Sequence, residues 1–269
     1  MSPRADYDAL YEQFDSPLML EIRREAYGED IGQHSWVTAA ELRADIGRLG
    51  VSARTRLLDL GCGPCGALAF VVQETGCRAV GADVSVAALA AGRARFAPLE
   101  LAGRVDLRSV DLDDPLPFGE AAFDAVISLD VVLHLEDRTK TFREVARVLA
   151  AGGTFLFTDA GVVTGTVSAE EVRLRSVHGR TQFVPPGFSE LALEEAGFEL
   201  LEREDRTASV LAIASGRLSA RNARLARLEA LEGVEEFHRQ QRYLETVIAI
   251  SQRRAVSRVM YFARRQPPR

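Results

Sequence analysis

A glycine-rich segment constrains the fold of this chain more than any other feature. The sequence Leu58-Asp59-Leu60-Gly61-Cys62-Gly63-Pro64-Cys65-Gly66 ends a short apolar run typical of a buried strand and precedes a helical pattern. Glycines at such a turn let the backbone approach a ligand closely. Asp83 follows Gly61 by 22 positions (83 − 61), the spacing of a ribose-binding carboxylate at the end of the next strand. The segment therefore predicts a site for an adenosine-containing cofactor.

Short apolar runs alternate with helical segments on both sides of this loop, the pattern of βαβ units around a parallel sheet. These runs predict seven strands, over residues 56–60, 78–83, 105–110, 123–129, 153–158, 198–204 and 258–263. Helices are expected over 86–96 and 139–149, with Gly152-Gly153 ending the second of them. The fold class is therefore α/β, with a doubly wound, seven-stranded, mostly parallel sheet.

The predicted elements divide the chain into four parts. Residues 1–50 form an N-terminal helical cap, 51–206 a cofactor-binding core, 207–256 a helical lid insert, and 257–269 the last core strand and a tail. Within the insert the pattern predicts a packed helix face, followed by a break at Gly233 and a second helix from 234 to about 256. That face consists of leucines at near-heptad spacing: Leu218, Leu225, Leu228 and Leu231.

Charge and cysteine content exclude several classes of function. The net charge of −6 argues against a nucleic-acid partner, because phosphate binding needs a basic face. No apolar run approaches the roughly 18 residues of a membrane span, and residues 1–7 lack the apolar stretch expected of a secretory signal. Three clustered cysteines, Cys62, Cys65 and Cys77, do not make a disulfide framework and fit a reducing compartment. We expect a cytoplasmic monomer or homodimer without a membrane partner.

The loop, taken alone, fits three kinds of chemistry. A nicotinamide- or flavin-dependent oxidoreductase would place a pyrophosphate near Asp59, which would repel it, whereas a cofactor with ammonium and sulfonium groups suits that carboxylate. The alternative interpretation of Asp59 is a structural carboxylate that caps loop amides, and this interpretation does not distinguish between the cofactors. The tetrapeptide Cys62-Gly63-Pro64-Cys65 matches the thioredoxin active site. Its flanking residues and the chain length do not match that fold, so we interpret these cysteines as small side chains in a tight loop.

The third interpretation of the loop is a site for a positively charged cofactor that contains adenosine. It depends on a carboxylate after the third predicted strand. Asp111 can accept a hydrogen bond from an adenine amino group while Leu112 packs on the ring. The alternatives for Asp111, Asp113 and Asp114 are a turn cluster and a divalent-ion site. No histidine or asparagine has the spacing of a further ligand, so we expect no metal.

Together these motifs resemble the class I S-adenosylmethionine-dependent methyltransferases, which have a Rossmann-like fold. The resemblance covers about residues 42–264 and comprises, in order, 57–63, Asp83, Asp111-Leu112, 123–126, 128–135 and 149–153. It implies that S-adenosylmethionine is the cofactor. It also implies a contact for each part of that molecule: Gly61 and Gly63 for the methionine part, Asp83 for the ribose, Asp111 and Leu112 for adenine, and Leu129 for the amino acid end. The expected cofactor-binding set further includes Trp36, Asp59, Cys62 and Val84.

The C-terminal third resembles the branch of this family that methylates small amines such as sarcosine, dimethylglycine and phosphoethanolamine. The supporting residues are 195–198, 204–207 and a last strand ending at 261–264, whereas the early signature of that branch is replaced by residues 27–36. We expect a small-molecule methyl acceptor, with an amine nitrogen first and oxygen or carbon as alternatives. An NAD(P)- or FAD-binding oxidoreductase and a catalytically silent binding protein are the alternatives of other classes.

Two histidines are the catalytic candidates, because an ammonium or phenol acceptor must lose a proton before it attacks. His134 follows the fourth predicted strand, at the sheet edge where open α/β folds bind ligands. His34 lies beside Trp36, in a segment expected to close over the cofactor.

The remaining histidines and the N-terminal aromatic residues have less specific interpretations. His178 is a candidate for the pocket wall, and His238 is expected on a solvated helix face. Tyr7, Tyr11 and Trp36 indicate either an aromatic wall for the acceptor or the packing of an N-terminal helix against the core.

Overall fold

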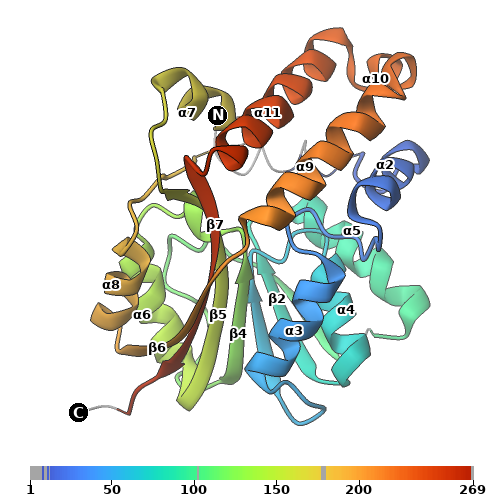
Figure 1. The fold of residues 1–269 in the computed structure, drawn as a ribbon. Coiled ribbons are helices and arrows are strands. Elements are labelled where there is room, and N and C mark those ends of the chain that lie inside the picture. The colour runs from blue at the N-terminus through green and yellow to red at the C-terminus, as the bar shows by residue number, and fades with distance from the viewer. Residues whose placement is uncertain (1–7, 9–10, 12, 102, 177–179, 268–269) are drawn as a thin grey trace.

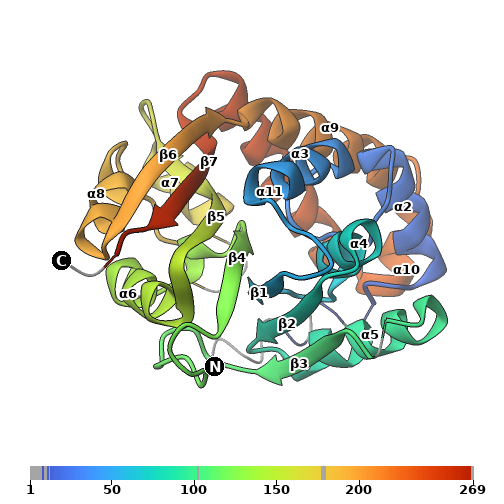
Figure 2. The same ribbon diagram turned by 90° about the horizontal axis from the view of Figure 1, so that it is seen from below.

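One seven-stranded sheet organises the molecule in this computed structural model, which describes residues 8, 11, 13–101, 103–176 and 180–267. The strand order is β3-β2-β1-β4-β5-β7-β6 (Figures 1 and 2). β7 is antiparallel to both of its neighbours, and all other adjacent strands are parallel. The predicted doubly wound α/β class is confirmed. The strands are β1 (Arg56–Leu60), β2 (Arg78–Asp83), β3 (Val105–Ser109), β4 (Phe123–Leu129), β5 (Leu149–Val163), β6 (Phe198–Asp205) and β7 (Val256–Arg265).

The strand order reverses between β1 and β4. β1 pairs in parallel with β2 on one side and with β4 on the other, so the chain winds outward in both directions from this point. Ligands of open α/β sheets bind beyond the carboxyl ends of the strands at such a switch point. The fold therefore places the ligand edge next to the glycine-rich loop that follows β1.

β5 is much longer than the predicted strand over 153–158. Helix α6 (Arg138–Val148) leads directly into it, so the prediction that Gly152-Gly153 ends this helix is wrong. Pairing with β4 begins at Leu149 and resumes at Thr154 after a register shift. Gly152 lies in this irregularity with a φ of 73°, a conformation that glycine adopts without strain. The glycines thus serve a bulge and not a helix end.

Helices cover both faces of the sheet (Figure 2). One face carries α3 (Ala39–Leu49), α4 (Gly66–Thr75), α5 (Val86–Phe96) and the short 3₁₀ helix η1 (Ala97–Leu99), and the other carries α6 and α8 (Phe188–Glu195). Leu57 and Leu58 of β1 belong to different core clusters because successive strand residues point to opposite faces.

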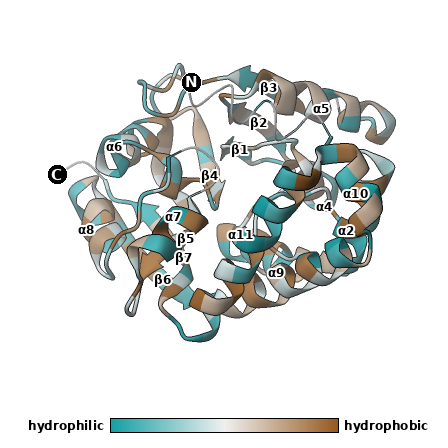
Figure 3. Cartoon of the chain, turned by 90° about the horizontal axis from the view of Figure 1, so that it is seen from above, coloured by the Kyte–Doolittle hydropathy of each residue, from teal (hydrophilic) through white to brown (hydrophobic). Residues whose placement is uncertain are grey.

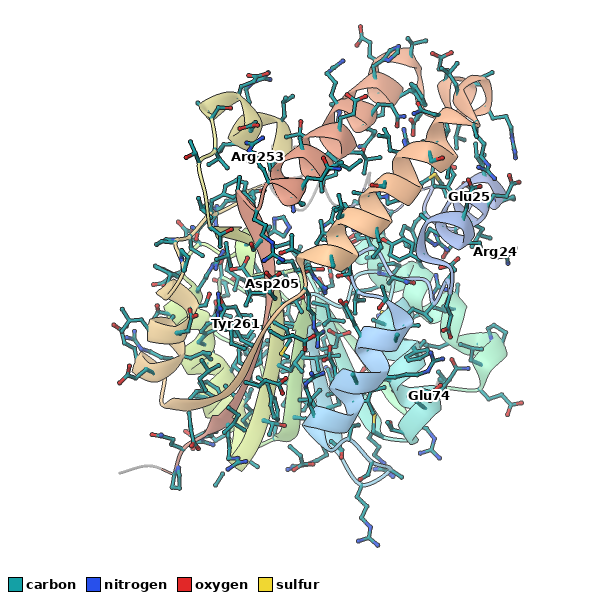
Figure 4. The ribbon with its side chains drawn as sticks, in the orientation of Figure 1. Arg24, Glu25, Glu74, Asp205, Arg253 and Tyr261 are labelled. Carbon is teal, nitrogen blue, oxygen red and sulfur yellow. The ribbon has the colours of Figure 1, made fainter. Side chains whose placement is uncertain are left out.

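Aromatic side chains fill the core under α6 and α8. Tyr261 of β7 stacks on Phe157 of β5, with ring centroids 4.9 Å apart and planes at 18° (Figure 4). Phe142 of α6 packs on the same Phe157 ring at 4.9 Å. Such stacked and tilted pairs add about 0.5–1.5 kcal/mol each beyond the burial of their area. These contacts join the last strand to the core although it enters the sheet in the antiparallel direction.

A second group of helices gathers over the ligand edge of the sheet (Figure 1). It pairs the N-terminal α2 with α9, α10 and α11 from late in the chain, through a cluster that includes Ile22, Leu228 and Phe237. After α11, Arg253 pairs with Glu171 of α7 at 2.6 Å (Figure 4). These helices are α2 (Pro17–Tyr27), α7 (Ala169–Arg175), α9 (Thr207–Asn222), α10 (Leu225–Glu232) and α11 (Val234–Gln252); the 3₁₀ turn η2 (Val132–His134) follows β4.

The leucine face predicted for this region forms only in part. The chain turns between α9 and α10, which rotates the later leucines relative to the earlier one. Leu228 is fully buried and Leu218 is half-buried, but Leu225 and Leu231 are 42% and 39% exposed. The prediction of a continuous packed face that includes Leu225 and Leu231 is therefore wrong. α9 and α11 carry hydrophilic as well as hydrophobic residues (Figure 3), and no helix in the described part of the chain is long and apolar enough to cross a membrane.

A fully buried arginine joins the helices over the ligand edge to the sheet. Arg258 of β7 donates from Nε to Asp130, which follows β4, at 2.8 Å, and from Nη1 to Glu41 of α3 at 2.9 Å and Ser209 of α9 at 3.2 Å. Asp130 also accepts the backbone N–H of Trp36 at 2.8 Å. One buried cation therefore holds the last strand, the end of β4, the N-terminal segment and α9 together.

Replacement of this arginine should lower stability strongly. Arg258→Met leaves the carboxylate of Asp130 buried without its cation, which should reduce the free energy of unfolding by about 3–5 kcal/mol. Urea denaturation followed by circular dichroism measures the change. Arg173→Ala is the matched control, because Arg173 and Glu170 form an exposed ion pair that contributes at most about 1 kcal/mol. Equal effects of the two substitutions would contradict the assignment.

Candidate active site

A cavity of about 500 Å³ opens at the carboxyl ends of the parallel strands. Strand ends form its floor, and the N-terminal segment and the helices over the ligand edge form its walls. The structure brings every residue of the predicted cofactor-binding and catalytic sets to this one cavity; their individual roles remain predictions. The set comprises His34, Trp36, Asp59, Gly61, Cys62, Gly63, Asp83, Val84, Asp111, Leu112, Leu129 and His134.

The glycine-rich loop is fixed by its neighbours on both sides. The backbone N–H groups of Gly61 and Cys62 both donate to the carbonyl of Ala82, at 2.7 and 3.1 Å, which ties the loop to the end of β2. Gly61 has a φ of 72°, and a Cβ there would collide with the side chain of Val131. Only glycine meets both requirements at this position. Gly61, Cys62 and Gly63 line the cavity, so the loop forms part of its floor.

Asp83 is held by backbone amides at the end of β2. Its Oδ2 accepts the N–H of Gly63 at 2.8 Å, and its Oδ1 accepts the N–H of Ser85 at 2.8 Å. Burial raises the pKa of Asp83, while these two amides oppose the rise. Each carboxylate oxygen keeps a second lone pair for a ligand. The carboxylate is therefore oriented before any ligand arrives.

Asp59 is a buried carboxyl group at the floor of the cavity. It is 2% exposed, and no donor among the described residues forms a hydrogen bond with its side chain. Burial, followed by repulsion from Asp83, raises the pKa of Asp59 to about 8. A bound cation would stabilise the ionised form. The prediction that Asp59 caps loop amides finds no support in these contacts, whereas a cationic ligand fits them.

The acidic segment after β3 is a turn. Asp111 accepts the backbone N–H of Asp113 at 3.0 Å, and Asp113 accepts the N–H of Glu136 and pairs with Arg180 at 3.1 Å. Asp113 thus has partners inside the protein, while exposed Asp111 and half-buried Leu112 line the mouth of the cavity. The described residues contain no cluster of histidine, cysteine and acidic side chains arranged to hold a metal ion.

His134 lies at the end of the turn η2 and lines the cavity. Its Nδ1 is 2.6 Å from the backbone carbonyl of Arg180, and a carbonyl oxygen can only accept, so Nδ1 carries the proton and Nε2 is the basic nitrogen. Burial lowers the pKa of His134. The imidazole is therefore neutral at pH 7 and able to accept a proton.

The other predicted histidines and aromatic residues differ in their surroundings. His34 packs edge-to-face against Tyr11 and Phe14, at centroid distances of 5.6 and 5.9 Å, so the N-terminal aromatic residues pack together at the cavity wall. His238 is exposed on α11, as expected. His178 and Tyr7 lie outside the described residues.

Sequence reasoning missed Arg175, Arg217 and Tyr243, which lie near the predicted Trp36 on the helical side of the cavity. Arg175 of α7 donates to the Tyr243 hydroxyl of α11 at 3.1 Å. The Tyr243 ring stacks on Trp36 at 6.5 Å and 26°, and the guanidinium of Arg217 lies 5.5 Å from the Trp36 ring centroid. Arg175 and Arg217 form no ion pair with any carboxylate in the described part of the chain, unlike Arg180. No local motif marks these residues, because three helices and a loop bring them together.

Comparison with known proteins identifies the domain. Residues 58–157 match the family model of the methyltransferase domain. A methyltransferase of Streptomyces halstedii is 35% identical over 59% of this chain and 58% of its own length. The O-methyltransferase resE of Aspergillus sclerotiorum is 29% identical over 75% of this chain and 78% of its own length. The glycine/sarcosine/dimethylglycine N-methyltransferase of Actinopolyspora halophila is 31% identical over 71% of this chain and 33% of its own length. The chain thus spans less than two thirds of the first and third of these relatives.

Solved structures share the fold. The phosphoethanolamine N-methyltransferase 2 of Haemonchus contortus aligns with a TM-score of 0.81 and 22% identity, over 100% of this chain and 61% of that one. The cyclopropane synthase MmaA2 of Mycobacterium tuberculosis aligns with a TM-score of 0.82 and 16% identity, over 97% of this chain and 98% of that one. At these identities the likeness concerns the Rossmann-like fold alone. The domain match and the named relatives confirm the resemblance to methyltransferases found in the sequence: residues 58–157 carry a methyltransferase domain. The match supports S-adenosylmethionine as the cofactor of this domain.

Proposed function

We propose that this chain transfers a methyl group from S-adenosylmethionine to a small amine that also carries an anionic group. The observation that carries the proposal is the division of one cavity into two chemically different parts. Asp59 and Asp83 lie on the floor at the strand ends, whereas Arg175 and Arg217 lie on the helical side. A cofactor with positive charge suits the first part, and an anionic acceptor suits the second.

The floor of the cavity fits the cofactor. Asp59 is a buried carboxyl without a donor among the described residues, and the ammonium and sulfonium groups of S-adenosylmethionine carry the charge that it needs. Asp83 presents oriented oxygens to the two ribose hydroxyls, and Asp111 with Leu112 would receive adenine at the mouth. When bound, the cofactor supplies an electrophilic methyl carbon on its sulfonium.

The helical side fits an anionic group on the acceptor. Arg175 is buried and donates to Tyr243, and it pairs with no carboxylate among the described residues. A buried guanidinium without such a partner is costly unless a ligand compensates it. Arg217 adds a second cation above Trp36. Carboxylate and phosphate are the anions that an arginine binds through two parallel hydrogen bonds. The relatives named after sarcosine and dimethylglycine support an acceptor of this class.

His134 would prepare the acceptor for attack. An ammonium has no lone pair until it loses a proton, and the neutral imidazole can accept that proton at Nε2. The rest of the work is positioning, because methyl transfer is an in-line displacement that requires the two reacting atoms to be aligned and kept from water. Residues 1–50 and 207–256 would act as the cap and the lid that exclude water.

An oxygen acceptor is the second candidate. The relative resE is named as an O-methyltransferase, and the same imidazole would take the proton of a hydroxyl group. The buried thiols Cys62, Cys65 and Cys77 support a cytoplasmic location for either activity.

Cofactor affinity should depend on pH through Asp59. Below about pH 8 its carboxyl is protonated in the free protein, and a bound cation favours the ionised form, so binding releases a proton. Affinity for S-adenosylmethionine should therefore rise with pH by up to about tenfold per unit and level off above about pH 8. Calorimetry across this range measures it. Asp59→Asn should weaken binding and flatten the dependence; an unchanged slope in that variant would contradict the role of Asp59.

The acceptor class can be tested with matched pairs of amines. Sarcosine with its neutral amide, and phosphoethanolamine with ethanolamine, differ in the anionic group alone. We expect the anionic member to have a KM roughly tenfold to a hundredfold lower, the contribution of one charge-assisted hydrogen bond. Arg175→Gln should remove this advantage, whereas Arg242→Gln, an exposed control on α11, should keep it. Equal KM values for both members of each pair would contradict an anionic acceptor.

Replacement of His134 should affect chemistry and spare cofactor binding. His134→Asn should lower kcat about 10²–10⁴-fold without changing affinity for S-adenosylhomocysteine, because His134 is expected to hold the acceptor's proton and not the cofactor. Since burial lowers its pKa, the acid limb of kcat should lie below about pH 6.5. His238→Asn, on an exposed helix face, is the matched control, and His34→Asn tests the second candidate. Near wild-type kcat in His134→Asn would rule out the general base.

A further inference from the structure

Two thiols lie together beneath the cofactor cavity. The Sγ atoms of Cys62 and Cys65 are 3.6 Å apart, and the backbone N–H of Cys65 donates to the carbonyl of Cys62 at 3.0 Å. This turn at the start of α4 places the two side chains on the same side, as a disulfide between residues three apart requires. The proposed methyl transfer gives neither thiol a chemical step, so the short distance between the two sulfur atoms is not explained by the proposed function.

Cys65 occupies a backbone conformation that favours glycine. Its φ and ψ are 60° and 22°, in the left-handed region where an L side chain is strained. Glycine at this position would relieve the strain. Strained residues of this kind cluster at functional sites, where the strain belongs to the mechanism. The chain nevertheless has a cysteine here, with its sulfur directed at Cys62.

Two glycines leave room for the sulfur atoms. A Cβ at Gly81 of β2 would lie 2.9 Å from the Sγ of Cys62, and a Cβ at Gly92 of α5 would lie 2.5 Å from the Sγ of Cys65. A side chain at either position would displace a sulfur atom. The pair therefore sits in a fitted enclosure formed by β2, α4 and α5.

We propose that Cys62 and Cys65 are a redox-responsive pair whose disulfide weakens cofactor binding, an inference that rests on the proposed function of the cavity. Gly63 lies between the two cysteines and donates its N–H to Asp83 at 2.8 Å. Closing the sulfurs from 3.6 Å to a bond of about 2 Å pulls on this segment of the loop. Of the two backbone hydrogen bonds that orient Asp83, the one from Gly63 is the contact most directly disturbed.

Hydrogen peroxide is an oxidant small enough to reach the pair through the cavity. Cys62 lines the cavity and is 8% exposed, whereas Cys65 is fully buried. The Cys62 thiolate attacks one peroxide oxygen, the O–O bond breaks, and the departing hydroxide takes up a proton to form water. Cys65 sulfur then attacks the resulting sulfenic acid, the S–S bond forms, the S–O bond breaks, and a second water leaves. Two thiols and one peroxide thus give one disulfide and two waters.

The pKa of the Cys62 thiol determines how fast this oxidation proceeds. The hydrogen bond with Cys65, and then burial, raise the pKa of the Cys62 thiol. Because the thiolate is the reactive form, oxidation should be slow at neutral pH and faster in alkaline buffer. The pair would therefore respond to sustained oxidant and not to brief exposure.

The test uses the whole chain and needs no variant for its main result. Reduced protein is treated with hydrogen peroxide, with and without saturating S-adenosylhomocysteine, and disulfides are mapped by alkylation and mass spectrometry. Calorimetry then measures S-adenosylhomocysteine affinity before oxidation, after it, and after dithiothreitol. We expect a Cys62–Cys65 disulfide that forms more slowly with the ligand bound. Affinity should fall roughly tenfold to a hundredfold, as for one charge-assisted hydrogen bond, and recover on reduction.

Two variants separate this pair from the third cysteine. Cys65→Gly should bind S-adenosylhomocysteine like the reduced wild type, since glycine accepts the left-handed conformation, and should lose its response to peroxide. Cys77→Ala should keep the response. A complete Cys62–Cys65 disulfide with unchanged affinity would overturn the proposal, as would oxidation of Cys62 to sulfinic acid without a disulfide. Failure of the reduced wild type to bind S-adenosylhomocysteine would contradict the proposed function, before any oxidant is added.

Discussion

The buried guanidinium of Arg258 fixes the shape of the cavity. A charge that cannot reach water must be matched by carboxylates at hydrogen-bonding distance, and Arg258 is matched by Asp130 and Glu41. Because Asp130 also holds the backbone of Trp36, the N-terminal segment cannot shift without disturbing this charge balance. The position of the cavity wall at Trp36 is therefore fixed by a residue of the last strand that does not itself line the cavity.

The local sequence pattern was enough to predict the strands near the glycine-rich loop. It failed to predict the extent of a strand where that extent depends on pairing with a distant segment. β1, β2 and β4 have their predicted bounds because each is a short apolar run between turn signals. β5 continues to Val163 because β7 pairs along its length, and no local signal announces that partner. Leu225 and Leu231 fitted a helical repeat, but the turn between α9 and α10 places them in solvent. Periodicity describes one helix and cannot tell where that helix ends and another begins.

The same division applies to the site. The sequence placed Asp59, Asp83 and Asp111 at one edge of the sheet because parallel strands have their carboxyl ends at the same edge, and the structure brings all three to one cavity. Arg175, Arg217 and Tyr243 come from three helices outside the sheet, and their convergence depends on how those helices pack. Asp130 follows a predicted strand and was visible as a carboxylate, but its role depends on Arg258, 128 residues later. The part of the cavity formed by strand ends was thus predictable from the sequence, and the part formed by helices was not.

This asymmetry has a chemical basis. Under the proposed function, the residues that would bind the cofactor lie where the fold itself fixes them, in the loops that follow the strands. Methyl transfer places few demands on the acceptor beyond a lone pair, alignment and exclusion of water, and helices over the sheet edge can meet those demands in many ways. An N-methyltransferase and a cyclopropane synthase accordingly align with this chain equally well. Acceptor identity must therefore be read from the side chains of α7, α9 and α11 and not from the fold.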